Sequence, residues 1–390
     1  MKLHRRSFVT GVAGVAAATS AANAASEREM PAVRADFPWA QNQTYLNTAT
    51  EHPIGLHCQR AIDEYLHALT YGPDSARDKF ENGHLMAEVK RMFAQLIGAK
   101  TSEIGFTPST QTGENLVLEG LSIQESRGNV VTNDLHYGGS LLNYRERQKA
   151  GLDVRIVPHR DYQMDMRDLE RAVDNKTKLI AIALVSNVNG YVHEVRKISD
   201  LAHAHGAYLY CDVIQAAGAV PLDVKSMDID FLACSAYKWL MGGRFGYLYV
   251  KEELQGSVMK PKLMGGRTTP AGASRYEIST ASHIGCVTQA AALAYIERLG
   301  VKRIREHAVP LTDRLQKELP ALGYKSITPP GSDSPIVSFQ VRDVEATQAR
   351  LKKANVIVTL RANPRESQMR VSVSVFNNMA DVDRLIGALA

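Results

Sequence analysis

The sequence has little of what disulfide-rich, metal-binding and membrane proteins are built from. Its 390 residues include only four cysteines and two tryptophans. No two cysteines have the Cys-x-x-Cys spacing of a zinc or redox site, and the twelve histidines are scattered, so we expect no metal site. Beyond residue 24 no segment is long and apolar enough for a transmembrane helix.

Excess charge of one sign is also small. Lys and Arg number 46 and Asp and Glu 41, which gives a formal charge of +5. The first 24 residues hold three of the bases and no acid, so the rest of the chain is near neutral. Basic residues are not clustered with aromatic ones, so we expect neither a nucleic-acid partner nor stable membrane association. We expect a small-molecule substrate.

The N-terminus has the pattern of an export signal. Lys2, Arg5 and Arg6 precede a short apolar run, 8–18, and small residues at 22–24 suit a signal peptidase. The paired arginines followed by Ser-Phe-Val resemble a twin-arginine signal. This predicts a periplasmic protein cleaved near Ala24, with an ordinary apolar tail or a retained anchor as the alternatives.

Two of the cysteines end apolar runs that have the composition of buried strands. We interpret Cys211 and Cys234 as core thiols. Whether any cysteine forms a disulfide in an oxidising compartment stays open at this point.

Short apolar runs alternate with amphipathic segments between residues 105 and 250. The predicted strands cover 129–132, 154–157, 179–185, 207–211, 231–234 and 245–250, and helices are expected at 165–173 and 195–204. This alternation predicts an α/β fold with a mainly parallel sheet covered on both faces. Ligands of such sheets bind beyond the carboxyl ends of the strands.

The last quarter of the chain has a different pattern. It predicts helices at 301–319, 344–354 and 380–390, and strands at 336–341, 356–360 and 369–375. We therefore expect a large domain at 56–295 and a smaller α+β domain at 296–390. Residues 25–55 are assigned to the small domain or to the mouth of the site.

Two strand ends carry residues with chemical potential. Asp212 follows the run 207–211, and Lys238 comes 26 residues later, after 231–234. A buried carboxylate needs a cationic partner, and a buried lysine tends to lose its proton and become a nucleophile. Gly242, Gly243 and Gly246 then permit a tight turn. A carboxylate for a pyridinium nitrogen and an amine for an aldehyde are the protein groups that pyridoxal-phosphate chemistry needs.

The segments 210–218 and 235–240 around these two residues resemble the class V aminotransferase family, which includes cysteine desulfurases and isopenicillin N epimerase. The resemblance extends over nearly all of the chain after the signal. It implies the fold type I of pyridoxal-phosphate-dependent transferases, with a seven-stranded, mainly parallel sheet and a smaller α+β domain. It also implies pyridoxal 5'-phosphate as cofactor, a Schiff base at Lys238 and a ring-nitrogen contact at Asp212.

The same resemblance assigns roles to further residues. Asn187 and Gln215 match the amides that bond the phenolic oxygen of the cofactor, and Arg370 matches the arginine that grips the substrate carboxylate. Residues matching the phosphate cradle are Thr110, Gln111, Ser235 and Tyr237, the last in place of the usual histidine.

Three further assignments are looser. Tyr137 falls where an aromatic ring stacks on the cofactor, with His136 as the competing residue. Thr280, in a turn resembling the family's Arg-Phe-Glu-x-Gly-Thr, matches a contact to the phosphate of a neighbouring subunit, which implies a homodimer. Plausible substrate-side residues, equally consistent with structural roles, are His52, Arg267 and Arg361.

These residues predict an enzyme that acts at the α-carbon of an amino acid or an amino-acid-derived metabolite. Cysteine desulfurases carry a persulfide-accepting cysteine shortly before the Arg370 position, and residues 360–368 contain none, so the sequence argues against that activity. The remaining alternatives are a transaminase, an epimerase similar to isopenicillin N epimerase, and a periplasmic tailoring enzyme of a siderophore-type peptide metabolite. A non-catalytic binding protein of the same fold is the alternative from another class.

Overall fold

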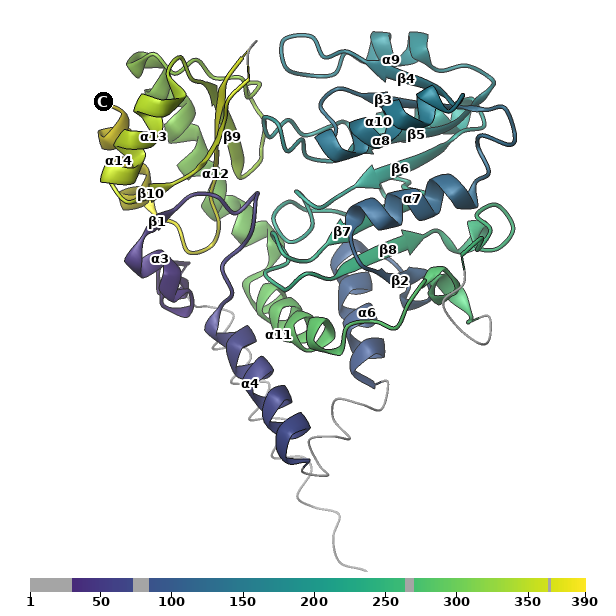
Figure 1. The fold of residues 1–390 in the computed structure, drawn as a ribbon, viewed down its shortest axis with the longest axis horizontal. Coiled ribbons are helices and arrows are strands. Elements are labelled where there is room, and N and C mark those ends of the chain that lie inside the picture. The colour runs from purple at the N-terminus through teal and green to yellow at the C-terminus, as the bar shows by residue number, and fades with distance from the viewer. Residues whose placement is uncertain (1–29, 73–83, 264–269, 364–365) are drawn as a thin grey trace, which may run out of the picture.

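A computed structural model describes residues 30–72, 84–263, 270–363 and 366–390 (Figure 1). The predicted signal peptide and Arg267 lie outside these ranges.

A seven-stranded sheet forms the centre of the large domain. Its strand order is β2-β8-β7-β6-β5-β3-β4, and only β8 runs antiparallel to its neighbours. The strands are β2 (Ile104–Thr107), β3 (Asn129–Asn133), β4 (Asp153–Val157), β5 (Thr177–Ala183), β6 (Tyr208–Asp212), β7 (Phe231–Ser235) and β8 (Gly246–Val250). The predicted mainly parallel α/β sheet is confirmed, with β2 as a strand that the sequence analysis missed.

Alternating residues of each strand build two separate cores, because successive side chains point to opposite faces of a sheet. Ile180 and Ile182 of β5 belong to one core, whereas Leu179 and Ala181 belong to the other. The first core is closed by α6 (His84–Ile97), α10 (Val195–Ala204) and α11 (His283–Leu299), and the second by α7 (Thr110–Gly120) and α8 (Gly138–Lys149). A short helix, α9 (Met166–Ala172), follows β4. The sheet is thus buried on both sides.

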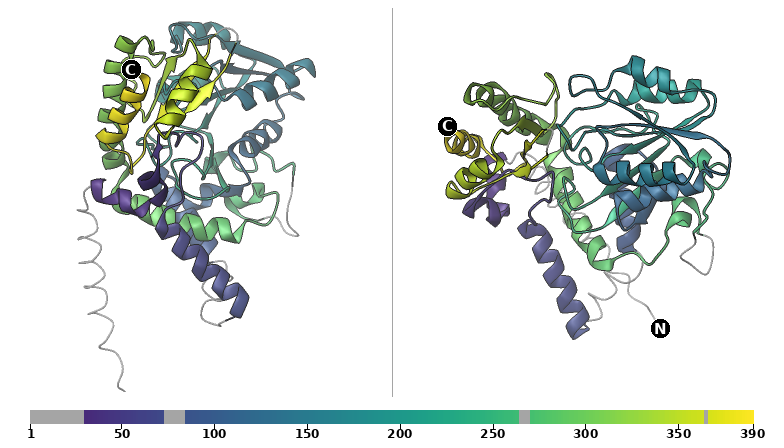
Figure 2. Two further views of the ribbon diagram at one scale, coloured as in Figure 1. Left: turned by 60° about the vertical axis from the view of Figure 1, so that its left-hand side comes forward. Right: turned by 45° about the horizontal axis from the view of Figure 1, so that its top comes forward.

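The C-terminal part lies beside the large sheet and has a core of its own (Figures 1 and 2). Its antiparallel sheet has the order β11-β12-β9. Leu315, Phe339 and Met369 are among the side chains that pack in its core. The elements are α12 (Val301–Glu318), β9 (Ile336–Gln340), α13 (Val344–Lys353), β10 (Val356–Ile357), β11 (Thr359–Arg361), β12 (Gln368–Ser372) and α14 (Met379–Leu389). The smaller α+β unit agrees with the prediction. The single strand expected at 356–360 is wrong, because β10 pairs with β1 whereas β11 pairs with β12.

The N-terminal described segment connects the two parts. β1 (Thr44–Tyr45) pairs with β10, and the backbone N–H of His52 donates to the carbonyl of Tyr237 beside the site (2.9 Å). α4 (Leu56–Tyr71) then packs against α11. The domain boundaries stay predictions, and α11 runs across the one expected at residue 295.

The four cysteines are buried free thiols, so Cys211 and Cys234 are core residues as predicted. Burial raises the pKa of Cys58 and of Cys286 to about 12. Across the described ranges, no helix combines the length and apolarity needed to cross a bilayer. The same ranges contain no cluster of three or more side chains suited to hold a metal ion.

Candidate active site

Two neighbouring strand ends bring Asp212 and Lys238 to the same edge of the sheet. Asp212 is the last residue of β6 and lies opposite Ala233 of the parallel strand β7, which ends three residues before Lys238. The chain then turns sharply, with the N–H of Gly242 donating to the carbonyl of Ala236 (3.0 Å). A Cβ at Gly242 would collide with the amide of Gln289, which is hydrogen-bonded to Tyr247 and to the carbonyl of Leu240, so a side chain there would displace that amide.

A cavity of about 100 Å³ lies at this edge and collects most of the predicted site residues. Its wall is formed by Ser109, Thr110, Gln111, Tyr137, Ser140, Asp212, Ile214, Ser235, Tyr237 and Lys238. Seven of these ten were proposed from the sequence as cofactor contacts. Residues at the ends of β2, β3, β6 and β7, together with Ser140 of α8, therefore meet at the place that the sheet topology predicted.

The amine and the carboxylate are both held in an environment that disfavours their charged forms. Lys238 is 7% exposed, and burial, reinforced by the charge of Arg370, lowers its pKa to about 8. Asp212 is 3% exposed, and burial raises its pKa to about 6 against the opposing influence of His136. One Asp212 oxygen accepts from the N–H of Ile214 (2.9 Å), and within the described residues neither Asp212 nor Lys238 forms an ion pair.

A buried amine and a buried carboxylate without ion-pair partners fit a ligand that supplies an aldehyde and a protonated ring nitrogen. These two side chains would hold the cofactor at opposite ends of one ring. Their lack of an ion-pair partner among the described residues, in a cavity lined by hydroxyl and amide groups, is the observation by which the residues present fit pyridoxal phosphate.

The N-terminus of α7 is tied to the end of β7. The N–H of Thr110 donates to the hydroxyl of Ser235 (2.8 Å), and the N–H of Ser235 donates to the hydroxyl of Thr110 (2.8 Å). Ser109 caps the helix by accepting from the N–H of Thr112 (3.1 Å). The positive end of the helix dipole and these hydroxyls suit a phosphate. The phosphate contacts of Thr110, Gln111 and Ser235 stay predictions.

Tyr137 and His136 take different positions. Tyr137 is 44% exposed and lines the cavity, whereas His136 is buried behind the wall. The ring Nδ1 of His136 accepts from the N–H of Tyr137 (2.7 Å), so its proton resides on Nε2, which lies 3.7 Å from a carboxylate oxygen of Glu114. Which ring stacks on the cofactor stays a prediction.

Glu114 is a buried acid that the sequence analysis missed. It accepts from the hydroxyls of Ser140 (2.5 Å) and Tyr144 (2.7 Å), and burial raises its pKa. Its position one helical turn after Thr110 was the available signal, since residues four apart share a helix face. Glu114 supports the cavity wall from behind through Ser140, which lines the cavity.

Arg370 connects the small domain to the site. One of its terminal nitrogens, Nη1, donates to the carbonyl of Asn187 (3.0 Å), and Nη2 donates to the hydroxyls of Thr50 (2.6 Å) and Thr359 (3.1 Å). Its Nε and the side-chain oxygen of Asn187 are buried without a hydrogen-bond partner. Burial and the charge of Arg361 lower the pKa of Arg370 to about 9. A substrate carboxylate bound to Arg370 would stabilise its charged form.

Gln215 and Thr280 lie away from the cavity wall. The amide of Gln215 donates to the carbonyl of Ala49 (3.0 Å) and accepts from the indole of Trp239 (2.9 Å). Thr280 is exposed and does not line the cavity. Their cofactor contacts therefore stay predictions.

His52 has a structural environment. Its Nδ1 lies 2.7 Å from the carbonyl of Pro53, which can only accept, so Nε2 accepts from the hydroxyl of Ser374 (2.9 Å). Burial lowers its pKa to about 4. With both ring nitrogens engaged, His52 is a neutral packing residue.

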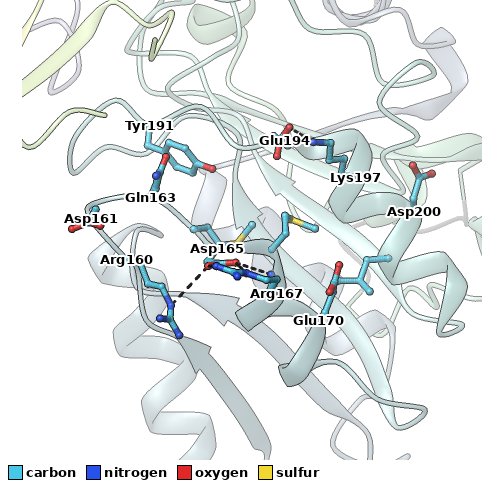
Figure 3. A pocket seen from close by; sticks show the side chains of 13 residues that line it. Arg160, Asp161, Gln163, Asp165, Arg167, Glu170, Tyr191, Glu194, Lys197 and Asp200 are labelled. Carbon is cyan, nitrogen blue, oxygen red and sulfur yellow. Dashed lines mark hydrogen bonds and ion pairs between the residues drawn. The ribbon is translucent and has the colours of Figure 1, made fainter. Parts of the chain in front are cut away.

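A second cavity lies between the loop before α9 and the start of α10 (Figure 3). Its charged side chains neutralise one another: Arg167 pairs with Asp165 (2.7 Å), and Lys197 pairs with Glu194 (2.5 Å). It includes neither Lys238 nor Asp212. We therefore assign the chemistry to the smaller cavity.

Comparison with known proteins decides the family. The sequence model of the aminotransferase class V family matches residues 57–385. The chain belongs to this family. Class V membership, together with the fit of Lys238, Asp212 and the α7 N-terminus, identifies pyridoxal phosphate as the cofactor.

Relatives of this class V chain include a probable cysteine desulfurase of Methanothermobacter thermautotrophicus, which is 28% identical over 80% of this chain and 82% of the relative. An uncharacterized aminotransferase, YcbU, of Bacillus subtilis is 25% identical over 91% of this chain and 95% of the relative.

Among solved structures, the cysteine desulfurase of Thermococcus onnurineus superposes with a TM-score of 0.81 at 28% identity, over 91% of this chain and 96% of that one. The cystine C-S lyase C-DES has a TM-score of 0.81 at 21% identity, over 90% and 98% of the two chains, and shows the same fold. The predicted fold type I is thereby confirmed.

These relatives correct one prediction. The sequence analysis excluded cysteine desulfurases because residues 360–368 contain no cysteine. The relatives that carry this name align over most of the chain, so the exclusion is wrong. The absence of one cysteine from a loop is weaker support for excluding an activity than a similarity over 80% or more of the sequence is for allowing it.

Proposed function

We propose that this class V protein removes the proton from the α-carbon of an α-amino acid, with Lys238 as the proton acceptor and Arg370 as the carboxylate-binding residue. One observation carries the proposal: a buried amine of lowered pKa and a buried carboxylate line one cavity, and the buried guanidinium of Arg370, which has no carboxylate partner among the described residues, acts on that amine through its charge. Pyridoxal phosphate, when bound, supplies an aldehyde that reacts with amines and a ring that accepts electrons.

Each side chain has a role that follows from its surroundings. Asp212, ionised above its pKa of about 6, keeps a proton on the ring nitrogen near it. Lys238, with a pKa of about 8, is basic enough to take the α-proton and is partly neutral at physiological pH. Arg370 binds the α-carboxylate of the substrate. Its hydrogen bond to the carbonyl of Asn187 holds the guanidinium in a fixed position relative to the large domain.

The names of the relatives support a second, more specific proposal: cleavage of a C–S bond in a cysteine-type substrate. Cysteine desulfurases and a cystine C-S lyase are among the relatives and fold neighbours. Loss of the α-proton precedes expulsion of a β-substituent, so the same residues serve this reaction. Epimerisation, as in isopenicillin N epimerase, requires return of a proton to the opposite face of the same carbon.

The products in deuterated water distinguish the reactions. Sulfide or persulfide release from cysteine or cystine supports C–S cleavage, and deuterium at the α-carbon without keto acid supports epimerisation. Keto acid together with pyridoxamine phosphate supports transamination. Borohydride reduction followed by peptide mapping must place the pyridoxyl group on Lys238. A purified protein that stays colourless with added cofactor contradicts the proposal and indicates a non-catalytic binding protein.

Location and assembly are further proposals. We propose export through the twin-arginine route with cleavage near Ala24, which agrees with a tailoring role on a periplasmic metabolite. Cell fractionation with and without the change of Arg5 and Arg6 to Lys tests it. We also propose a homodimer in which Thr280 approaches the partner's phosphate site, and sedimentation of the wild type tests the assembly.

A further inference from the structure

Strand β11 places a second arginine on the face of the small sheet that carries Arg370. Thr359 lies directly opposite Arg370, and Arg361 lies opposite Gln368. Residues two apart on a strand share a face, so Thr359 and Arg361 both point the way that Arg370 points. The hydroxyl of Thr359 bonds to Arg370, which confirms this direction. Arg361 is thus the diagonal neighbour of Arg370, with Cα atoms typically about 7–8 Å apart in such pairs.

The Arg361 guanidinium has no charge partner in the described chain. It is partly buried and forms no hydrogen bond or ion pair with any described residue. Burial lowers its pKa, and Tyr137 is the group that opposes this effect. Glu51, an acid near the mouth, is 3.7 Å from Arg244 instead.

Two guanidinium groups on one face of the small sheet therefore lie near enough to the amine of Lys238 to influence it. Each cation lowers the pKa of another: Arg361 acts on Arg370, and both act on Lys238. Within the cavity wall, Asp212 is the one carboxylate, and its charge acts on Lys238. A partly buried cation beside other cations raises the free energy of the folded protein unless a bound anion neutralises it. An α-carboxylate neutralises Arg370, and Arg361 is left for another anion.

We propose that Arg361 forms a second anion subsite, and that the preferred substrates are α-amino acids whose side chain ends in an oxyanion, either a carboxylate or a sulfur oxyacid such as a sulfinate. This inference rests on the proposed function at the same site. A planar guanidinium with five donors suits both oxyanions because it can bond two oxygens at once. Tyr137, whose charge acts on Arg361, is exposed and lines the cavity that holds Lys238.

The test measures equilibrium binding to the cofactor-loaded protein through the visible absorbance of the cofactor. Matched pairs of ligands are titrated: L-aspartate and L-asparagine, L-glutamate and L-glutamine, L-cysteine sulfinate and L-serine. One charge-assisted interaction predicts that an acidic member binds at least about 10-fold more tightly than its neutral counterpart. The carboxylate and sulfinate arms identify which oxyanion fits.

Arg361→Gln should remove this difference by weakening only the acidic ligand, while Arg361→Lys should retain part of it. Arg342→Gln, on the exposed surface of the small domain, is the matched control and should bind both members as the wild type does. Retention of the cofactor and the melting temperature should be unchanged in Arg361→Gln, which separates the subsite from a folding or phosphate-binding role.

The outcomes separate the two proposals. Equal affinity for acidic and neutral ligands overturns the second subsite while the proposed function stands. An equal loss for both ligands in Arg361→Gln also overturns it, because Arg361 then shares the α-carboxylate with Arg370. If no amino acid changes the absorbance, the proposed function itself fails.

Discussion

The lowered pKa of Lys238 predicts how fast the apoprotein takes up its cofactor at different pH values. Only a neutral amine attacks an aldehyde. With a pKa of about 8 instead of 10.5, about one amine in ten is neutral at pH 7, roughly 300-fold more than for an ordinary lysine. Attachment should therefore quicken as pH rises from 6 to 8 and level off above that.

The assay mixes apoprotein with pyridoxal phosphate and follows the visible absorbance over time. A free lysine derivative, measured in parallel, corrects for the ionisation of the cofactor. Arg370→Gln removes a buried cation that lowers the pKa of Lys238, so the plateau should move to higher pH. Arg244→Gln is the control, because its side chain is 76% exposed and is not among the groups that shift Lys238.

A rate that keeps rising about tenfold per pH unit between 8.5 and 10 would refute this reasoning. Lys238 would then have an ordinary pKa, and the amine would lie in a more hydrated environment than the structure shows. An unchanged plateau in Arg370→Gln with an otherwise intact protein would refute the electrostatic link between the two domains.

Further changes have expected results. Below pH 8 Lys238 is protonated in the folded state although its surroundings disfavour the charge, and this lowers the free energy of unfolding. Lys238→Met should therefore stabilise the apoprotein at pH 7 by up to about 3 kcal/mol, and this gain should shrink between pH 8 and 10.5. Urea unfolding at several pH values measures the effect. Glu114→Gln leaves one buried hydroxyl facing an amide donor, and should cost about 1–3 kcal/mol in the same assay. Gly242→Ala drives a methyl group into the Gln289 amide and should lower the melting temperature, at a cost of about 1–3 kcal/mol. The four thiols should resist a thiol reagent in the native protein and react on unfolding.

Much of the large domain could be predicted from the sequence, because strand ends and helix starts are local features. Asp212 and Lys238 follow apolar runs of strand length, and adjacent parallel strands place such residues at one edge. Ser109, Thr110 and Gln111 start a helix with a capping serine, which has its own sequence pattern. The chemistry of an amine and a carboxylate at that edge was therefore available before any fold was known.

Other parts could not be predicted because they depend on partners distant in the chain. Arg370 meets the carbonyl of Asn187 across 183 residues, and the amide of Gln215 is engaged by Ala49 and Trp239. The strand expected at 356–360 divides because its first half pairs with β1 and its second with β12. No local pattern encodes such a division.

The sequence by itself determined the identity of the reactive pair and the edge of the sheet on which it lies, since both follow from the alternation of apolar and polar residues. Only the tertiary structure decided how strongly Lys238 and Asp212 are desolvated, which ring lines the cavity, and that Arg361 lies on the same face of the small sheet as Arg370. Burial and charge pairing are sums over neighbours contributed by several distant segments, and a pKa or an unpaired cation exists only once those neighbours are in place.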